Sequence, residues 1–329
     1  MARLSYAQAA CTALAEAMRA DPRVVALGED VGRGGIFAQY RGLAQEFGSQ
    51  RVIDTPISEA TIMGAAVGMA LNGLKPVVEM RVVDFALCSM DEVVNQAAKA
   101  RFMFGGQGRV PLVARMPNGL WSGSAAQHSQ SLEAWFAHIP GLVVVTPATP
   151  ADNYALLHAA IESGDPVIYL EHKELWGTEG DVPDGRRIAL GAADVRRAGG
   201  DATLVTWSST VHAALAAAES AAKRGLAVEV IDLRTIWPWD RDAVLASAAK
   251  TGRLLVAHEA VQAGGFGAEV AATVAEELGI PVQRLGAPRI PVGYSKPLED
   301  EARITPDKIV AALVALCDRQ GPGRIAARR

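Results

Sequence analysis

Short apolar segments alternate with longer helical patterns along the whole chain, and this alternation constrains the fold more than any other feature. Apolar, β-branched runs at Val24–Leu27, Pro76–Met80 and Val110–Met116 are separated by stretches long enough for helices. Parallel strands need a crossover connection, usually a helix, and a strand covered on both faces is apolar throughout. The sequence therefore predicts an α/β fold of mostly parallel sheets with helices on both faces.

The alternation occurs in two blocks, separated by a stretch at 174–201 that is rich in glycine, proline and charged residues. Such a composition is typical of a domain boundary. We therefore predict a first domain over residues 1–185, a linker over 186–200 and a second domain over 201–329. A chain of 329 residues is long enough for each domain to bury its own core.

Composition and charge argue against several classes of protein. The net charge is only −4 and no basic face dominates, so we expect no nucleic-acid partner. No apolar run approaches the roughly 18 to 20 residues that span a bilayer, so we expect no membrane partner. The three cysteines, Cys11, Cys88 and Cys317, are far apart and lack zinc-binding or redox spacing, which indicates a reducing compartment and a cytoplasmic protein.

Glu59 is the first candidate for chemistry. It falls in the first turn of a predicted helix, Glu59–Leu71, built largely from Ala, Gly, Met and Val. The helix dipole favours the ionised carboxylate and the apolar neighbours penalise it, so the pKa of Glu59 can be tuned for acid or base catalysis. The alternative, and the commoner meaning of this pattern, is a helix cap in which Ser58 or Thr55 bonds the backbone. The residues alone leave both alternatives open.

Three further motifs have a structural and a functional interpretation. His128 stands in a long polar loop, Pro117–Gln130, where it either bonds the backbone or serves function. Glycines at 264, 265 and 267 follow a strand ending at His258, but they lack dinucleotide-loop spacing, so they indicate close packing or an anion site. The acid cluster Glu299–Glu301 is interpreted as a solvated face.

Several motifs together resemble one family. The strings DTPISEATIMGAAVGMALNG, AAQHSQSLEAWFAHIPGLVVVTPATPAD, GDPVIYLEHKELWG, GGFGAE and PLEDE occur in order. They resemble the beta subunit of thiamine-diphosphate-dependent 2-oxoacid dehydrogenases, a transketolase-like family that includes pyruvate, branched-chain and acetoin enzymes. The resemblance implies a pyrimidine-binding domain followed by a transketolase C-terminal domain. It also implies a heterotetramer of two alpha and two beta chains, magnesium ligands on the alpha chain and acyl transfer to a lipoyl-bearing acyltransferase core.

The resemblance also implies roles for individual residues. Glu59 matches the glutamate that hydrogen-bonds the aminopyrimidine ring of the cofactor, and Glu29 matches a second acid near that ring. Ile57 and Phe85 match residues that line the pyrimidine pocket. His128 matches a histidine that faces the substrate and the incoming lipoyl group.

A structural potassium site is implied in the same way, with ligands at Leu112, Ala160, Ile161, Ser163 and Asp165. Two departures from the family pattern affect the expected pocket. Cys88 stands where many relatives have glutamine, and the segment from Arg81 to Asp84 replaces a more usual aromatic-containing approach to Phe85. Both departures change the polarity of the pocket, on which the choice of substrate depends.

The sequence leaves the substrate and two alternative functions open. The first hypothesis is a beta chain that acts with an alpha chain on pyruvate or acetoin, with a branched-chain 2-oxoacid as the alternative substrate. The second is a non-catalytic scaffold subunit. The third is a self-contained nicotinamide dehydrogenase that uses the glycines at 264–267.

Overall fold

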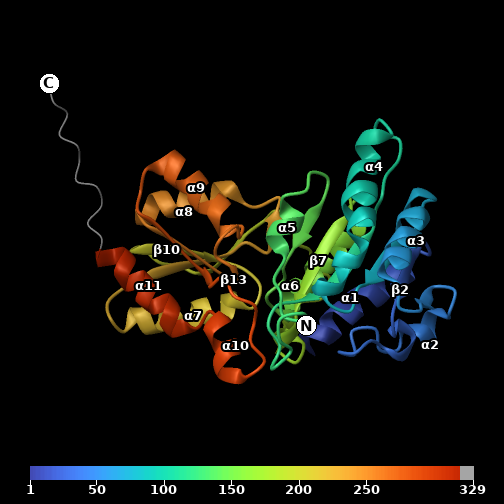
Figure 1. Cartoon of the computed structure of the whole chain (residues 1–329), viewed down its shortest axis with the longest axis horizontal. Coiled ribbons are helices and arrows are strands. Elements are labelled where there is room, and N and C mark those ends of the chain that lie inside the picture. The colour runs from blue at the N-terminus through green and yellow to red at the C-terminus, as the bar shows by residue number, and fades with distance from the viewer. Residues whose placement is uncertain (319–329) are drawn as a thin grey trace. The chain divides into compact units, whose positions relative to one another are not determined.

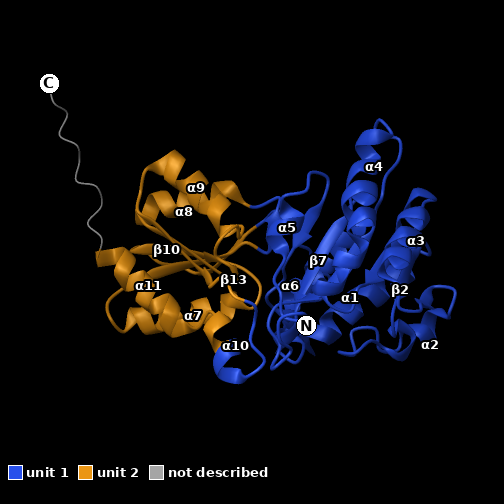
Figure 2. Cartoon of the chain, viewed as in Figure 1, with its two compact units in different colours: residues 1–192, 234–239, 291–299 blue, residues 193–233, 240–290, 300–329 orange. Residues whose placement is uncertain are grey.

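The computed structural model describes residues 1–318, which form two compact units (Figures 1 and 2). Unit 1 holds residues 1–192, 234–239 and 291–299, and unit 2 holds 193–233, 240–290 and the described residues from 300 onward. Two short segments of the predicted second domain therefore belong to unit 1. The predicted linker also differs from the structure, because its residues Asp194–Arg197 form a strand, β9, of the unit 2 sheet.

Among the described residues, unit 1 carries a seven-stranded sheet in the order β12-β6-β7-β5-β4-β2-β3. All neighbouring strands run parallel except β12 and β6. A separate antiparallel pair joins β1 (Ala2–Ser5) to β8 (Glu179–Val182). The strands of the large sheet are β2 (Val24–Gly28), β3 (Val52–Asp54), β4 (Lys75–Glu79), β5 (Val113–Asn118), β6 (Val143–Val145), β7 (Val167–His172) and β12 (Thr235–Trp237).

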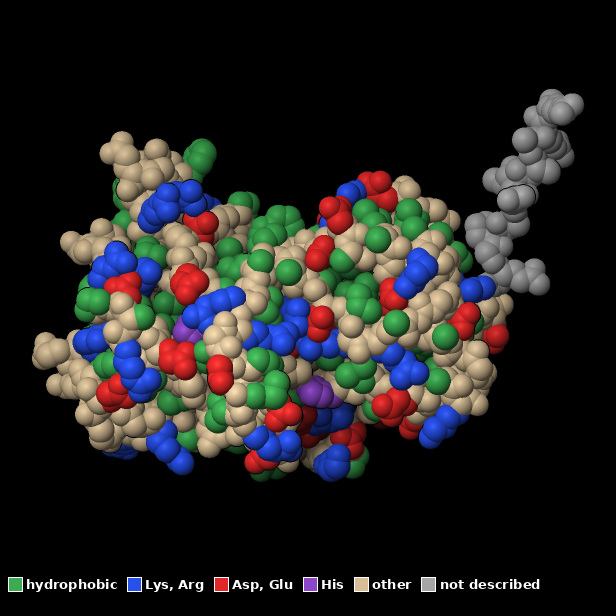
Figure 3. Space-filling model, turned by 180° about the vertical axis from the view of Figure 1, so that it is seen from behind, with side chains coloured by type: hydrophobic (Ala, Val, Ile, Leu, Met, Phe, Trp, Pro, Cys, Tyr) green, Lys and Arg blue, Asp and Glu red, His purple; other side chains and the backbone are tan. Residues whose placement is uncertain are grey.

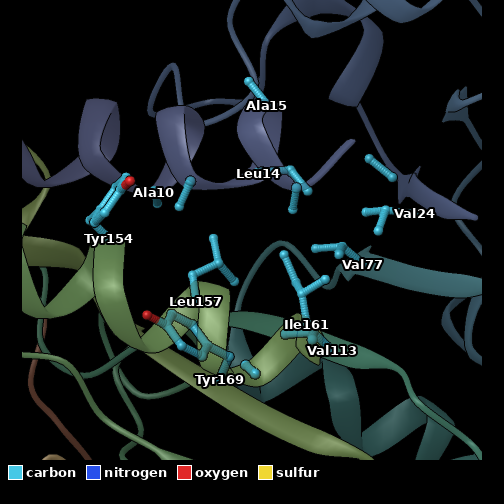
Figure 4. Packing of buried hydrophobic residues seen from close by; sticks show 14 of the residues in the cluster. Ala10, Leu14, Ala15, Val24, Val77, Val113, Tyr154, Leu157, Ile161 and Tyr169 are labelled. Carbon is cyan, nitrogen blue, oxygen red and sulfur yellow. The ribbon is translucent and has the colours of Figure 1, made fainter. Parts of the chain in front are cut away.

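The core of unit 1 lies between this sheet and two helices, α1 (Tyr6–Ala20) and α6 (Pro150–Glu162). Figure 4 shows Leu14 of α1 and Leu157 of α6 pointing into the same cluster. Each such fully buried leucine stabilises the fold by about 1.5–3 kcal/mol. Both helices begin at side-chain caps, since Ser5 forms a capping box with Gln8 and the Thr149 hydroxyl accepts a hydrogen bond from the backbone N–H of residue 152.

The segment after β4 forms three kinds of helix in succession. The segment starts as a 3₁₀ helix, η2 (Val83–Ser89), continues through a π-helical stretch, η3 (Glu92–Ala97), and ends in α4 (Ala98–Met103). Its first turn has no side-chain cap because the N-cap residue is Val82. The Asp84 carboxylate accepts a hydrogen bond from the Gln130 amide at 2.8 Å. The remaining helical segments of unit 1 are η1 (Val31–Arg33), α2 (Leu43–Phe47), α3 (Glu59–Leu71), α5 (Glu133–Ala137) and η4 (Lys173–Leu175).

Within the described chain, unit 2 has a five-stranded sheet in the order β14-β13-β10-β11-β9, parallel except for β9. Helices α7 and α11 cover one face, and α8 and α9 lie together on the other (Figure 1). The strands are β10 (Ala202–Thr206), β11 (Val228–Asp232), β13 (Leu254–Val261) and β14 (Val282–Ala287). The helices are α7 (Thr210–Ala222), α8 (Arg241–Thr251), α9 (Gly267–Leu278), α10 (Lys296–Ala302), which spans the division of the chain at residue 300, and α11 (Pro306–Asp318).

Both sheets confirm the predicted fold class.

Positive and negative side chains are intermixed over the face shown in Figure 3. Within residues 1–318, no helix has both the length and the apolar character needed to cross a membrane.

Candidate functional site

The predicted catalytic and pyrimidine-pocket residues of unit 1 follow the carboxyl ends of neighbouring strands of its sheet. Strands β2, β3 and β4 run parallel, and Gly28 is paired with both Asp54 and Glu79. The residues that follow these strand ends therefore leave the sheet at the same edge. In open parallel sheets this carboxyl edge is where ligands bind.

Glu59 begins α3 at this edge, and the structure argues against the simple cap interpretation. Ser58 occupies the N-cap position, but its hydroxyl bonds the Thr61 hydroxyl at 2.8 Å and makes no capping hydrogen bond to the backbone. The buried Thr55 hydroxyl has no partner in the described structure either. The Glu59 carboxylate itself forms no hydrogen bond or ion pair within residues 1–318, so it can accept a ligand.

Glu29 lies in electrostatic contact with Glu59. Burial raises the pKa of Glu29, the Arg81 guanidinium opposes that rise, and the negative charge of Glu59 adds to it. Arg81 is 3.8 Å from the Glu29 carboxylate and 2.7 Å from that of Asp30. The edge therefore holds two coupled glutamates, of which one is paired with a cation and the other is not.

An apolar and aromatic surface accompanies these acids. Ile57 is 77% exposed. The rings of Phe85 and His128 meet edge to face, with centroids 5.3 Å apart. The structure thus brings Phe85 and His128 together, although they are 43 residues apart in the sequence.

The loop that carries His128 is fastened at several points within unit 1. At its base, the Gly119 amide donates to the carbonyl of Gln130 at 3.0 Å, and the Gln130 side chain donates to Asp84. The ammonium group of Lys173, whose residue is only 2% exposed, donates to the His128 carbonyl. These bonds hold the backbone of His128 while its side chain stays exposed.

The solvated-face interpretation of Glu299 is wrong. Glu299 is only 3% exposed, and its carboxylate accepts a hydrogen bond from the Gly123 amide at 2.9 Å. The acid therefore supports the His128 loop, a contact that sequence spacing does not reveal.

Sequence reasoning also missed a buried ionic group beneath this edge. Arg115 donates two hydrogen bonds of 2.8 Å to Glu171, with both side chains fully buried, and its guanidinium lies 4.8 Å from the ring centroid of Tyr40. Burial raises the pKa of Glu79 to about 7, opposed by Arg115. The available signal was a charged residue inside each of three apolar strand runs.

The predicted potassium ligands cluster around the turn that follows α6. The Asp165 amide donates to the Ser163 hydroxyl at 3.2 Å, and the Leu112 carbonyl accepts from the Val167 amide at 2.9 Å. The Asp165 carboxylate forms an ion pair with Arg101. No group of three or more His, Cys, Asp or Glu side chains in the described part of the chain is placed to hold a metal ion.

The corresponding edge of unit 2 is filled by aromatic rings. His258 stacks on Trp207 with centroids 5.0 Å apart, and the Phe266 ring meets Trp207 edge to face. A Cβ atom on Gly265 or Gly267 would lie 2.6 Å from the His258 ring. The glycines therefore allow close packing against the His258 ring.

The chain thus has two α/β units with mostly parallel sheets, and the first carries acids, aromatic rings and a fastened histidine loop at the carboxyl edge of its sheet. A solved structure described as "Split gene transketolase, inactive beta4 tetramer" has the same fold, with a TM-score of 0.81 and 24% identity, over 95% of this chain and 98% of that one. Residues 2–178 match the family described as "Transketolase, pyrimidine binding domain", and residues 191–309 match "Transketolase, C-terminal domain".

Curated relatives place the chain more narrowly. It is 41% identical to the 2-oxoisovalerate dehydrogenase subunit beta of Bacillus subtilis (strain 168), over 97% of this chain and 100% of the relative. It is 43% identical to the acetoin:2,6-dichlorophenolindophenol oxidoreductase subunit beta of the same organism, over 96% and 98%. The pyruvate dehydrogenase E1 component subunit beta of Rhizobium meliloti (strain 1021) is 41% identical over 96% and 70%. The chain belongs to the transketolase-like beta subunits of thiamine-diphosphate-dependent 2-oxoacid and acetoin dehydrogenases, which confirms the predicted family.

Proposed function

We propose that this chain is the beta half of a heterotetrameric dehydrogenase that acts with an alpha chain on pyruvate or acetoin and passes the acyl group to a lipoyl-bearing acyltransferase core. A branched-chain 2-oxoacid is the alternative substrate, since one relative is a 2-oxoisovalerate dehydrogenase subunit. The observation that carries the proposal is the Glu59 carboxylate, which has no partner among residues 1–318 and lies near the exposed Ile57 side chain and the coupled Glu29.

These residues fit the pyrimidine end of thiamine diphosphate. An aminopyrimidine ring needs a carboxyl group at its ring nitrogen and apolar contact on its faces. Glu59 would hold the proton at that nitrogen, and Ile57 and Phe85 would contact the ring. When bound, the cofactor supplies the electron sink for cleavage of the bond next to the substrate carbonyl.

His128 would handle a proton at the substrate and at the lipoyl group. Its exposed imidazole lies against the Phe85 ring, and its backbone is held by Lys173. A general acid needs a fixed position and access to the reacting group, and this loop provides both. Because Glu59 and His128 are both in place, the non-catalytic scaffold is the weaker candidate.

The remaining ligands and the compartment are assigned on chemistry. Magnesium would be held by the alpha chain together with the diphosphate. Potassium would bind through backbone oxygens near Ser163 and Asp165, as the family pattern implies. The free thiols of Cys11, Cys88 and Cys317 are in keeping with a cytoplasmic protein.

Reconstitution tests this proposal. The purified chain is mixed with its alpha partner, thiamine diphosphate and magnesium, and reduction of 2,6-dichlorophenolindophenol is followed with pyruvate, acetoin and branched-chain 2-oxoacids. We expect turnover that requires both chains and prefers one substrate class. Turnover by the beta chain alone, or none with any of these substrates, would contradict the proposal.

A further inference from the structure

Arg81 occupies an unusual position beside the acids of the unit 1 edge. It follows β4 with a backbone φ of 52°, and Asp30, which follows the neighbouring strand β2, has a φ of 57°. Residues other than glycine rarely adopt this left-handed backbone conformation. The two residues are joined by an ion pair of 2.7 Å, so two strained strand ends are tied together by one guanidinium.

The acids at this edge are not equally neutralised. Asp54 accepts a hydrogen bond from the Gly32 amide at 2.7 Å. Asp30 is paired by Arg81, and Arg33 approaches its other oxygen at 3.8 Å. Among the charged groups that face Glu29, namely Arg81 from the end of β4, Glu59 from α3 and the adjacent Asp30, only Arg81 is a cation in the described structure.

Arg81 is therefore the counter-charge for a pair of like-charged glutamates. Two carboxylates in electrostatic contact cannot both remain ionised easily without a cation. The Arg81 guanidinium lies 3.8 Å from Glu29, and its side chain is 27% exposed, so solvent screens this interaction only in part. Removal of the guanidinium would leave Glu29 and Glu59 without a facing cation, and Asp30 with Arg33 alone.

We propose that Arg81 is a positioning residue that keeps Glu29 ionised beside Glu59, so that Glu29 is an anion when the pyrimidine binds. This inference rests on the proposed function for its catalytic consequence. Its electrostatic part concerns the isolated chain. Arg81 acts through Glu29 and is not assigned a contact with substrate.

The first test measures Glu29 directly. The carboxyl carbons of glutamate are labelled with ¹³C in the full chain without cofactor, and the Glu29 resonance is assigned by its loss in Glu29→Gln. We expect Arg81→Met to raise the titration midpoint of Glu29 by about one pH unit, and Arg81→Lys to restore most of the shift. The matched control Arg33→Met, which contacts Asp30 but not Glu29, should leave the midpoint in place. An unchanged midpoint in a folded Arg81→Met chain would overturn the inference.

The second test uses the reconstituted enzyme and separates this inference from the proposed function. The acid limb of the pH profile of kcat should move upward in Arg81→Met by the amount seen in the titration, and return in Arg81→Lys. A shifted titration with an unshifted profile in an active enzyme would overturn the positioning role. A wild-type enzyme that fails to turn over any substrate would overturn the proposed function and leave the titration result as support for the electrostatic part.

Discussion

The two units of this chain share an architecture but differ at the edge where ligands bind in such folds. In unit 1, three residues follow the strand ends at this edge. Glu29 is paired with the single cation Arg81, Glu59 has no partner within residues 1–318, and the Ile57 side chain is exposed. In unit 2, the corresponding edge is packed with Trp207 and His258. The same architecture therefore has polar and exposed side chains at this edge in unit 1 and packed aromatic side chains in unit 2, so the edge residues and not the fold make the difference.

Apart from the Glu59 variant described last, the largest expected effect tests the unit 1 edge through His128. We expect His128→Asn to lower kcat of the reconstituted enzyme by about 100-fold or more, because a positioned proton donor is lost. The control is His138→Asn, an exposed histidine of the same unit. Equal kcat values for His128→Asn and His138→Asn would show that the His128 side chain has no part in turnover.

The packed edge should respond in stability. Gly267→Ala would place a Cβ atom 2.6 Å from the His258 ring, and overpacking of this kind costs about 3 kcal/mol in the free energy of unfolding. Gly200→Ala, in the same unit with no atom within 4 Å, serves as the control. Urea unfolding should separate the two variants, and a tolerated Gly267→Ala would show that unit 2 has room at its edge.

Buried titratable groups sharpen the comparison, because they give the two units opposite pH dependence. Burial raises the pKa of Glu79 in unit 1 to about 7, so the folded state retains a proton that the unfolded state loses. The stabilisation is present at low pH and is lost as pH rises toward 7. We expect Glu79→Gln to be about 2 kcal/mol more stable, relative to wild type, at pH 8 than at pH 5. An equal difference in the free energy of unfolding between Glu79→Gln and wild type at pH 5 and pH 8 would contradict the raised pKa of Glu79.

His258 in unit 2 should show the reverse sign. Burial lowers the pKa of this imidazole to about 4, so the unfolded state takes up a proton first when the pH falls. The stability of unit 2 should therefore decrease between about pH 6.5 and pH 4. Urea unfolding of His258→Gln should show a smaller loss in the free energy of unfolding over this pH range than wild type shows. An equal loss in the two proteins would mean that other groups cause the sensitivity to acid.

The smallest expected effect concerns the cap of α3. Because the Ser58 hydroxyl bonds Thr61 and not the backbone, Ser58→Ala should cost less than about 0.5 kcal/mol, below the typical cost of about 1 kcal/mol for losing a cap. Thr149→Ala, which removes the cap of α6, should show that typical cost. Equal losses in thermal unfolding would restore the cap interpretation of the Glu59 turn.

The sequence predicted what depends on local pattern. Apolar runs and helix lengths gave the α/β class, and the family motifs identified Glu59 and His128 as candidates that the structure places at one edge. The pattern could not predict pairings made by distant segments. Thr235 joins the unit 1 sheet beside Val145, and Glu299 is buried against the Gly123 amide, because these contacts depend on tertiary packing.

Charged residues inside strands were the most informative signal that sequence reasoning did not use. Glu79, Arg115 and Glu171 each lie in an otherwise apolar run, and an unpaired charge in such a run is costly. A partner was therefore to be expected, but its identity depends on the strand order β7-β5-β4, which the sequence does not specify.

The most direct test of the account is the thiamine-diphosphate-dependent turnover of Glu59→Gln in the reconstituted enzyme. Glutamine preserves the shape of the side chain but cannot hold a carboxyl proton, so we predict a loss of about 100-fold to 10,000-fold in kcat. The control Glu219→Gln, an exposed glutamate of α7 in unit 2, should retain wild-type turnover. Full activity of Glu59→Gln would contradict the central claim that the open edge of unit 1 holds the pyrimidine ring.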